Sequence, residues 1–365
     1  MPSPKRVIFN GKFLSAGPTG VHRVARELIR NIGRLASEDR SSLAGAQLEL
    51  WVPSDAEDVT AEEFQMPVQR IGGPTGIPWE QLVLPFRAGK DMVVSLCNVG
   101  PMLSKNAITM FHDAQVHISP KSYSFGFRTW YHIHQPVAGR RHKTILTVSN
   151  FSKQQLADRK IAPSQKIVPI WNGVDQFREI QPDPTILSRL TLQPRNYVVG
   201  LANTQAHKNI GLLLRVFQRP ELQGQKLVLF GSATADDFKK CGHSVPDNTL
   251  FAGRVNDPEL SALYQSATCL AFPSTTEGFG LPPLEAMVTG CPAVIAPCGA
   301  LPEVCGEAAL VADPDDAKAW ADAIFHLANE DDFYGKQSRL ATAHAAQFTW
   351  DRAAKQLLEE IKKAM

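Results

Sequence analysis

The chain has 365 residues, of which 44% are hydrophobic and 20% are charged. This length exceeds what one hydrophobic core usually serves and predicts two domains, while the composition excludes a disordered, collagen-like or low-complexity chain. The net charge of +2 is unevenly divided, because residues 1–180 carry 22 lysines and arginines against 15 aspartates and glutamates, a net +7, and residues 181–365 carry a net −5.

Short apolar runs alternate with amphipathic stretches in the first half of the chain, which is the pattern of a parallel α/β sheet. Residues 6–9 predict a first strand, a glycine-containing turn follows, and residues 21–35 have the apolar spacing of a helix. Further strands are predicted at residues 48–52, 92–96, 107–111 and 145–148.

The same rhythm restarts after a polar, proline-rich stretch at residues 181–184. Strands are predicted at residues 197–201, 226–230, 249–251, 269–272 and 293–295, and helices at 210–217, 258–266, 283–289 and 316–327. We therefore expect an α/β fold of two doubly wound, Rossmann-like domains, residues 1–180 and 181–349, with a closing helix at 350–365 that belongs to the first. Two such domains place a ligand in the cleft between them, at the carboxyl ends of their strands.

Cysteine usage and hydropathy indicate the compartment. None of the six cysteines is paired as CxxC, which favours reduced thiols in the cytoplasm. The first residues lack the apolar stretch of a secretion signal, and no apolar run reaches the length of about 18 residues that a membrane span needs. The sequence predicts a cytoplasmic protein that meets a membrane only from its inner face.

Residues 274–287 carry the strongest chemical signal. They follow an apolar strand and lead into a helix, and Gly278 and Gly280 let the backbone of this loop approach a ligand closely. The positive end of a helix dipole attracts anions such as phosphate. Glu277 and Glu285 bracket the loop with seven residues between them, so a diphosphate flanked by two hydroxylated rings would meet a carboxylate at each ring. The pattern predicts a sugar-nucleotide site; the alternative is a structural glycine turn with Glu277 as a capping acid.

This E-x7-E string resembles the donor-site signature of the family-4 retaining glycosyltransferases, which have the two-domain GT-B fold. The resemblance extends over nearly the whole chain. Further segments in family order are GPTGVHR at 17–23, FHD at 111–113, TVSNFS at 147–152, WNGVD at 171–175, HKN at 207–209, AGRV at 252–255, LPEV at 301–304 and FTW at 348–350.

The resemblance assigns roles to the residues of the donor site. It implies that Glu277 binds the hydroxyls of the donor sugar, that Glu285 binds the ribose, and that Lys208 neutralises the diphosphate leaving group. The sugar and the phosphates would be held by the backbone amides of Gly278, Phe279, Gly280 and Leu281. Asp313 and Asp315 form a D-x-D pattern, which other glycosyltransferases use to hold a metal, but they directly precede a helix and are interpreted as a cap. We therefore expect no metal and no cofactor.

Other expected contacts are less fully specified by the resemblance. His112 would face the reacting carbon from the acceptor side. Gly20, a candidate donor-binding residue, lies in a loop expected to line the cleft and to close over the acceptor or the phosphates; the alternative is a plain turn between a strand and a helix. Relatives often carry a second cation, an arginine six residues or one residue before the lysine, where this chain has Ala202 and His207. Either His207 or Arg254 replaces it, and Arg254 has the alternative role of bracing the loop around the base.

Five of the ten histidines lie between residues 112 and 142, but their spacing does not indicate a metal site. The surrounding segment, residues 119–143, mixes aromatic side chains with the cations Lys121, Arg128, Arg140, Arg141 and Lys143. Together with the net charge of the first half, this mixture suggests contact with an anionic membrane or a lipid-linked acceptor; the alternative is an internal helix pair with one wet face. Basic side chains beside aromatic ones could also stack nucleic-acid bases, but no other feature of the sequence indicates nucleic-acid binding.

The sequence thus predicts a retaining hexosyltransferase that moves a sugar from a nucleotide diphosphate donor to a glycan hydroxyl. The resemblance to the mannosyltransferase-like branch implies GDP-mannose as the donor and a lipid-linked intermediate of a bacterial surface polysaccharide as the acceptor. With no obvious nucleophile on the opposite sugar face, a same-face displacement assisted by the leaving phosphate is implied. Two alternatives are a sugar-nucleotide epimerase or hydrolase of the same fold and a catalytically silent sugar-nucleotide-binding subunit.

Overall fold

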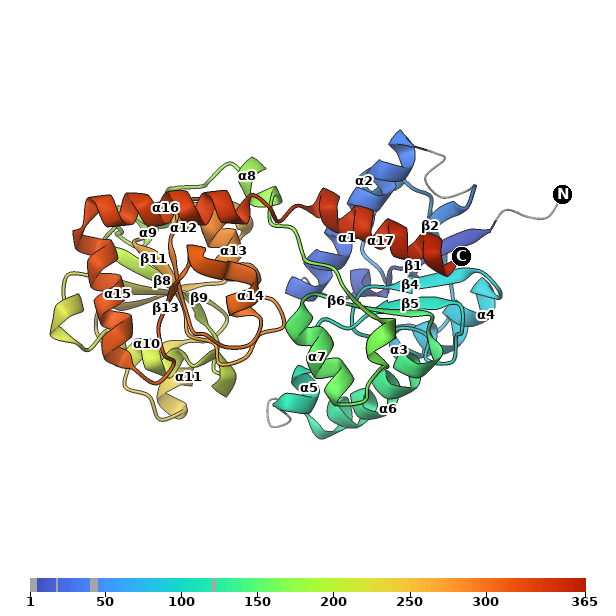
Figure 1. Ribbon diagram of the computed structural model, residues 1–365, viewed down its shortest axis with the longest axis horizontal. Helices are drawn as coiled ribbons and strands as arrows, with labels where there is room; N and C mark the ends of the chain where they lie inside the picture. Colours follow the sequence, from blue (N-terminus) through green and yellow to red (C-terminus); the bar gives the residue numbers. More distant parts are fainter. Residues whose placement is uncertain (1–4, 18, 40–44, 120–122) are drawn as a thin grey trace. The chain divides into compact units, whose positions relative to one another are not determined.

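The computed structural model describes residues 5–17, 19–39, 45–119 and 123–365, so Pro18 and Lys121 lie outside the described residues. The chain forms two units (Figure 1). Unit 1 comprises Met1–Gly173 together with Thr349–Met365, and unit 2 comprises Val174–Phe348. Each unit is an α/β body built on one parallel sheet.

Unit 1 contains a seven-stranded sheet in which each strand pairs in parallel with its neighbours. Its strands, in spatial order, are β3 (Val68–Ile71), β2 (Gln47–Pro53), β1 (Arg6–Asn10), β4 (Met92–Ser95), β5 (Ala107–Met110), β6 (Thr144–Thr147) and β7 (Ile167–Pro169). Central strands such as β4 and β5 are buried at every residue, as expected for a sheet covered on both faces.

Helices cover both faces of this first sheet. The helices are α1 (Gly20–Glu38), α2 (Ala61–Phe64), α3 (Gly76–Pro78), the π-helical turn η3 (Trp79–Val83), α4 (Leu84–Ala88), α5 (Gln115–Ile118), α6 (Phe125–Arg141), α7 (Asn150–Asp158) and α17 (Trp350–Ala364). The closing helix α17 packs against α1 (Figure 1). Both present one apolar side at helical spacing, which buries Leu28 and Ile32 of α1 and Leu357 and Ile361 of α17.

Unit 2 contains a six-stranded parallel sheet. Its strands, in spatial order, are β10 (Thr249–Gly253), β9 (Lys226–Gly231), β8 (Tyr197–Ala202), β11 (Cys269–Phe272), β12 (Ala293–Ile295) and β13 (Leu310–Val311). Its helices are α8 (Gln176–Glu179), α9 (Thr185–Arg189), the 3₁₀ turn η6 (Ala206–Lys208), α10 (Ile210–Val216), α11 (Ala235–Lys240), α12 (Asp257–Ser266), α13 (Leu281–Val288), α14 (Leu301–Cys305), α15 (Ala317–Asn329) and α16 (Asp331–Ala345).

Three strands were not expected from the sequence, namely β3, β7 and β13. All three lie at the edge of a sheet. They are short or polar: β3 exposes its two central residues, β7 ends in proline, and β13 has two residues. An edge strand is covered less completely than a central one and therefore lacks the continuous apolar run that marks a buried strand.

The interpretation of Asp313 and Asp315 as the cap of the following helix is wrong. The side chain of Asp316 caps α15 and accepts hydrogen bonds from the backbone N–H groups of Lys318 and Ala319. Asp313 instead accepts from the N–H of Asp315 at 2.8 Å, within the turn that precedes the helix.

All six cysteines are free thiols, and Cys269, Cys291 and Cys305 are buried. No helix in the described parts of the chain is long and apolar enough to cross a bilayer.

Candidate functional site

The carboxyl edge of the second sheet brings together two of the expected donor-site residues. Lys208 ends the turn η6 that follows β8, and Glu277 lies in the loop that follows β11. Because β8 and β11 are neighbours, about 4.8 Å apart, the two loops leave the sheet side by side. The Lys208 Nζ lies 2.6 Å from the Glu277 Oε1 and donates a hydrogen bond to it.

This ion pair is largely sheltered from water. The exposed fraction is 16% for the side chain of Lys208 and 14% for that of Glu277. The Nζ also lies 5.8 Å from the ring centroid of Phe272, the last residue of β11. An ammonium has three N–H donors, of which Glu277 engages one. Lys208 can therefore hold Glu277 and still donate to an anion.

His207 lies directly beside this pair. Its backbone oxygen accepts hydrogen bonds from the N–H of Thr275 at 2.8 Å and from the Thr275 hydroxyl at 3.3 Å, which fastens the two loops together. Burial lowers the pKa of His207, the positive charge of Lys208 lowers it further, and Glu277 opposes the shift. His207 is thus neutral near pH 7 in the ligand-free site.

Two buried polar atoms in this region have no hydrogen-bond partner among the described residues, the Nδ1 of His207 and the Oγ of Ser274. Nearly all buried polar atoms in folded proteins are paired, so unpaired ones at a sheet edge are candidates for ligand contact. Ser274 was not singled out in the sequence, where a serine after a strand is unremarkable.

The backbone around Glu277 is fixed by the segment after β12. The N–H of Ala300 donates to the backbone oxygen of Glu277 at 3.0 Å. Gly299 has φ +63°, and a Cβ there would lie 2.5 Å from the backbone nitrogen of Glu277. Only glycine fits this close approach without moving the loop.

The glycine loop leads into α13 as expected. Gly280 has φ +111° and precedes the first turn without a side-chain cap. Pro282 and Pro283 have no N–H, so among the first three helical residues only Leu281 carries a donor. Amide donors for an anion must therefore come from residues 278–281 rather than from the interior of the first turn.

The other predicted donor residues lie around this loop at different depths. Phe279 is buried, Gly278 and Leu281 are half-buried, and Glu285 is buried on α13 with an exposed fraction of 6%. Arg254 is exposed and follows β10, two strands away from β8 at the same carboxyl edge. It makes no hydrogen bond or ion pair with the part of the chain that the structure describes.

His112 follows β5 in unit 1 and is 6% exposed. Its backbone N–H donates to the Oδ1 of Asn98 at 2.7 Å, and its Nε2 lies 2.8 Å from the backbone oxygen of Leu96. Burial lowers the pKa of His112 to about 4. The ring is therefore neutral, its Nε2–H donates to Leu96, and its Nδ1 carries the lone pair.

Gly20 is exposed and opens α1, whose cap is the side chain of Thr19. The remaining histidines of the central cluster differ in burial. His134 and His142 are fully buried, with ring nitrogens 2.7 Å from the Gly100 oxygen and 2.9 Å from the Thr109 hydroxyl, respectively. In the described ranges, no three histidine, cysteine or acidic side chains are arranged to hold a metal ion.

A second polar cluster, which sequence reasoning missed, lies at the carboxyl edge of the first sheet. It centres on Glu80, a buried carboxylate paired with Lys12. The available signal was the polar pair Glu80–Gln81 inside the otherwise apolar stretch IPWEQLVLPF at residues 77–86.

Known proteins resemble this chain in sequence and in structure. The family model of the glycosyl transferases group 1 matches residues 194–330. O-antigen chain mannosyltransferase B of Escherichia coli is 30% identical over 283 residues, which cover 72% of this chain and 71% of that protein. O-antigen chain mannosyltransferase RfbU of Salmonella typhimurium is 28% identical over 241 residues, or 65% of each chain.

Solved structures of low sequence identity share the fold over almost the whole chain. HepE of Anabaena, crystallised in complex with UDP and glucose, has a TM-score of 0.72 at 18% identity and covers 99% of this chain and 100% of its own. WaaG, a glycosyltransferase involved in lipopolysaccharide biosynthesis, has a TM-score of 0.70 at 14% identity, with 97% and 99% covered. The expected GT-B fold of two Rossmann-like domains is confirmed. By its matching family model and its identity to O-antigen chain mannosyltransferase B, the chain belongs to the group 1 glycosyl transferases.

Proposed function

We propose that this glycosyltransferase moves a mannosyl residue from GDP-mannose to a hydroxyl of a lipid-linked glycan, with retention at the anomeric carbon. The observation that carries the proposal is the Lys208–Glu277 pair beside the glycine loop of unit 2. It combines a sheltered cation for a diphosphate, a carboxylate for sugar hydroxyls and a backbone that can approach both.

The residues of unit 2 supply electrostatics and positioning. The acceptor oxygen forms a bond to the anomeric carbon while the bond from that carbon to the diphosphate oxygen breaks. The departing oxygen gains negative charge, which Lys208 neutralises, and it takes up the proton of the acceptor hydroxyl on the same face of the sugar. Lys208 is already fixed by Glu277 before the donor arrives, so little reorganisation is needed at the moment of reaction.

The donor and acceptor classes are supported by the named relatives. O-antigen chain mannosyltransferase B and RfbU both act, by their names, as mannosyltransferases on an O-antigen chain. The serotype-specific mannosyltransferase WbdA of Escherichia coli is 26% identical over 238 residues. A nucleoside diphosphate donor agrees with HepE, which binds UDP on the same fold.

We further propose that unit 1 contacts an anionic membrane on which this acceptor is carried. Ten large hydrophobic side chains are exposed among the described residues, and seven of them lie between residues 77 and 133: Ile77, Leu82, Phe86, Leu103, Phe125, Phe127 and Ile133. Exposed cations accompany them at Arg87, Lys90, Lys105, Arg140, Arg141 and Lys143. Apolar side chains next to cations are the combination that binds anionic lipid surfaces.

One hydrogen bond joins a cation of this group to an exposed apolar residue. The Nη2 of Arg141 donates to the backbone oxygen of the exposed Leu103 at 2.9 Å, so a cation and an apolar side chain adjoin. Other parts of the aromatic and basic segment belong to the core: Tyr131 is buried and stacks on Phe127, with ring centroids 4.3 Å apart.

The test is an incubation of the purified protein with GDP-mannose, UDP-glucose, UDP-galactose and ADP-glucose, each with and without octyl α-mannoside as a soluble acceptor. We expect nucleotide release only with GDP-mannose and acceptor together, and an α-linked disaccharide product by NMR. Release without acceptor would point to a hydrolase or epimerase, binding without release would point to a silent subunit, and a β-linked product would contradict retention.

A further inference from the structure

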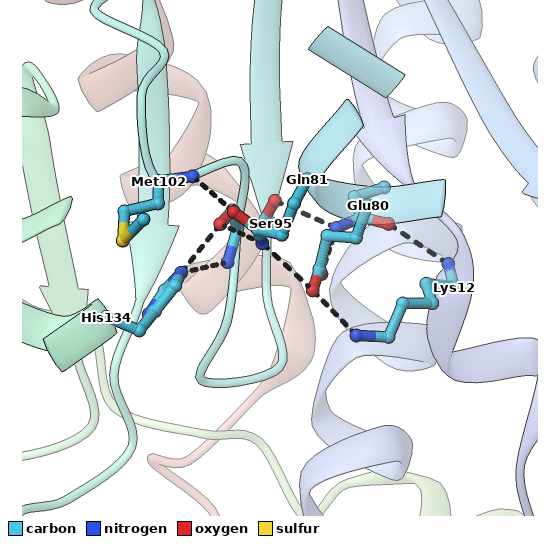
Figure 2. Close-up of polar contacts among 8 residues, drawn as sticks. Lys12, Glu80, Gln81, Ser95, Met102 and His134 are labelled. Carbon is cyan, nitrogen blue, oxygen red and sulfur yellow. Dashed lines mark hydrogen bonds and ion pairs between the residues drawn. The ribbon is translucent and has the colours of Figure 1, made fainter. Parts of the chain in front are cut away.

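The carboxyl edge of the first sheet contains an ion pair that the donor chemistry does not use. The neighbouring strands β1 and β4 end there, at Asn10 and Ser95. Glu80 lies at this edge of the sheet, beside Lys12, which opens the turn η1 (Lys12–Ser15) (Figure 2). Its Oε2 accepts from the Nζ of Lys12 at 2.6 Å, and its Oε1 accepts from the Nδ2 of Asn10 at 2.8 Å. The carboxylate is thus held on both oxygens.

A distorted helix directs Glu80 inward. Trp79–Val83 forms a π-helical turn, an uncommon element that is often found at functional sites. Trp79 anchors this turn, because its ring is fully buried and its Nε1 donates to the Ile71 oxygen at 2.9 Å. The Glu80 side chain is 3% exposed as a result.

The loop after β4 is held rigidly against the same turn. The Nε2 of Gln81 donates to the Gly100 oxygen at 2.8 Å, and the N–H of Met102 donates back to the Oε1 of Gln81 at 2.8 Å. The Nε2 of His134 lies 2.7 Å from the same Gly100 oxygen (Figure 2). A site whose supporting groups are fixed in this way is preorganised for a ligand.

The two partners of the ion pair differ in accessibility. Glu80 is buried, whereas the Lys12 side chain is 25% exposed. Glu80 engages one of the three N–H donors of the Lys12 ammonium. Among the described residues, the ammonium makes no other hydrogen bond, so two donors remain. Burying an ion pair usually gives no more stability than packing apolar side chains of the same size. The pair is therefore better explained by what the remaining donors of Lys12 can bind.

The charge of this edge selects the class of ligand. Glu80 cancels the charge of Lys12. The nearby His22 and His134 are neutral at pH 7 because burial lowers the pKa of each ring. At the Lys208–Glu277 pair, the backbone N–H groups of the glycine loop can add donors for a phosphate, whereas the Lys12–Glu80 pair is held by side chains that engage Glu80 itself. A neutral sugar needs only fixed hydrogen-bond donors, which the ammonium of Lys12 supplies.

We propose that Lys12 is a specificity-determining residue that binds the acceptor: its ammonium donates hydrogen bonds to the hydroxyl oxygens of a neutral acceptor glycan. Glu80 is a positioning residue that holds the ammonium in place. The inference rests on the proposed glycosyl transfer, since it places the acceptor of that reaction on unit 1.

The test compares Lys12→Met, Lys12→Arg and Glu80→Gln with the wild type, using octyl α-mannoside as the acceptor. Lys12→Met loses two hydrogen bonds that the charged ammonium would donate to the acceptor. The KM of this variant for the acceptor should therefore rise about 10- to 100-fold. The Kd for GDP should stay near wild type. The melting temperature should fall in Lys12→Met, because the buried Glu80 carboxylate loses its partner, and should recover in Lys12→Met/Glu80→Gln, in which the unpaired charge is removed. Lys12→Arg should recover most of the acceptor affinity. The matched control is Lys355→Met, which removes an exposed lysine of unit 1 that is also paired with a carboxylate.

A double-mutant comparison separates positioning from structural support. If Glu80 acts through Lys12, the combined variant Lys12→Met/Glu80→Gln should bind acceptor no more weakly than Lys12→Met alone. An unchanged acceptor KM in a folded Lys12→Met protein would overturn the proposal. Competition by pyrophosphate gives a further check. If pyrophosphate competes with the acceptor in wild type but not in Lys12→Met, Lys12 belongs to an anion site and the proposal is overturned.

A failure of the proposed function can be distinguished from a failure of the inference about Lys12. It would appear in the wild type, as absence of transfer from GDP-mannose. The inference about Lys12 is read independently from saturation-transfer NMR of octyl α-mannoside, which needs no donor. There, a signal that wild type gives and Lys12→Met loses supports the inference, and equal signals from both contradict it.

Discussion

Lys208 and Glu277 form a 2.6 Å ion pair although they lie 69 positions apart in the chain. The contact exists because Lys208 follows β8, Glu277 follows β11, and these strands are adjacent in the sheet. The expected diphosphate-binding cation and the expected sugar-binding carboxylate therefore act on each other before any ligand binds.

Removing the negative charge of Glu277 should have opposite effects on nucleotide binding and on transfer. In Glu277→Gln, the Lys208 ammonium is no longer partly neutralised, so GDP should bind as tightly as in wild type or up to about tenfold more tightly. Transfer should fall about 10- to 100-fold because the carboxylate proposed to hold the sugar is lost. Calorimetry with GDP and initial rates of transfer check both, with the exposed Glu307→Gln as the control. A weaker affinity for GDP would contradict this division of roles.

Gly299 should be essential for the position of Glu277. In Gly299→Ala, the new Cβ would come within 2.5 Å of the Glu277 nitrogen and displace the loop. Gly242→Ala is the matched control, because Gly242 also has positive φ, +84°, but has no atom within 4 Å of its Cβ position. Gly242→Ala should lose about 1 kcal/mol of stability because of its backbone conformation alone, and Gly299→Ala should lose more because its Cβ also displaces the backbone of Glu277. Only Gly299→Ala should lose activity, by about tenfold or more. Equal activities in the two variants would show that this close approach is unimportant.

Buried histidines should make the stability of unit 1 sensitive to acid. Burial lowers the pKa of His112 and of His142 to about 4, whereas the unfolded chain titrates its histidines near pH 6.5. The unfolded state therefore binds more protons between these values, and stability present above about pH 6.5 is lost as the pH falls toward 4. Each histidine accounts for up to about 3 kcal/mol over this range.

Melting temperatures measured between pH 7 and pH 4 check this expectation. His142→Gln should flatten the loss relative to wild type, although it also lowers stability at pH 7 by disturbing the hydrogen bond with Thr109. The exposed His132→Gln should leave the pH dependence unchanged. An identical slope in wild type and His142→Gln would contradict a neutral, buried His142.

Membrane contact should depend on the exposed apolar residues of unit 1. Leu103 is 67% exposed, and Leu103→Ser should reduce sedimentation with phosphatidylglycerol vesicles about three- to tenfold by removing apolar area that enters the interface. Leu340→Ser, which changes an exposed leucine of unit 2, should bind as wild type does. Equal binding of both variants, or binding to phosphatidylcholine vesicles as strong as to phosphatidylglycerol, would exclude this surface as an anionic-lipid site.

The sequence predicted the elements whose burial is continuous, and the candidate donor-site residues that it proposed in one string lie together in one loop. Central strands such as β4 and β11 appear as apolar runs, and residues 277–285 form a contiguous loop and helix start. The edge strands β3 and β13 have no such run. The Lys12–Glu80 pair joins residues 68 positions apart, and the contact depends on a π-helical turn that has no periodic signature in sequence. Strand order is equally hidden, so the direct contact of Lys208 with Glu277 could not be predicted from the sequence.

The most direct test of the account is acceptor-dependent GDP release by Lys208→Ala. In the proposed mechanism the ammonium of Lys208 balances the charge of the leaving diphosphate, so its loss should reduce release from GDP-mannose about 100- to 1,000-fold. The control Lys239→Ala, which removes an exposed lysine of unit 2 that is also paired with a carboxylate, should retain wild-type rates. A folded Lys208→Ala protein with wild-type GDP release would contradict the role of Lys208 and the donor site built around it.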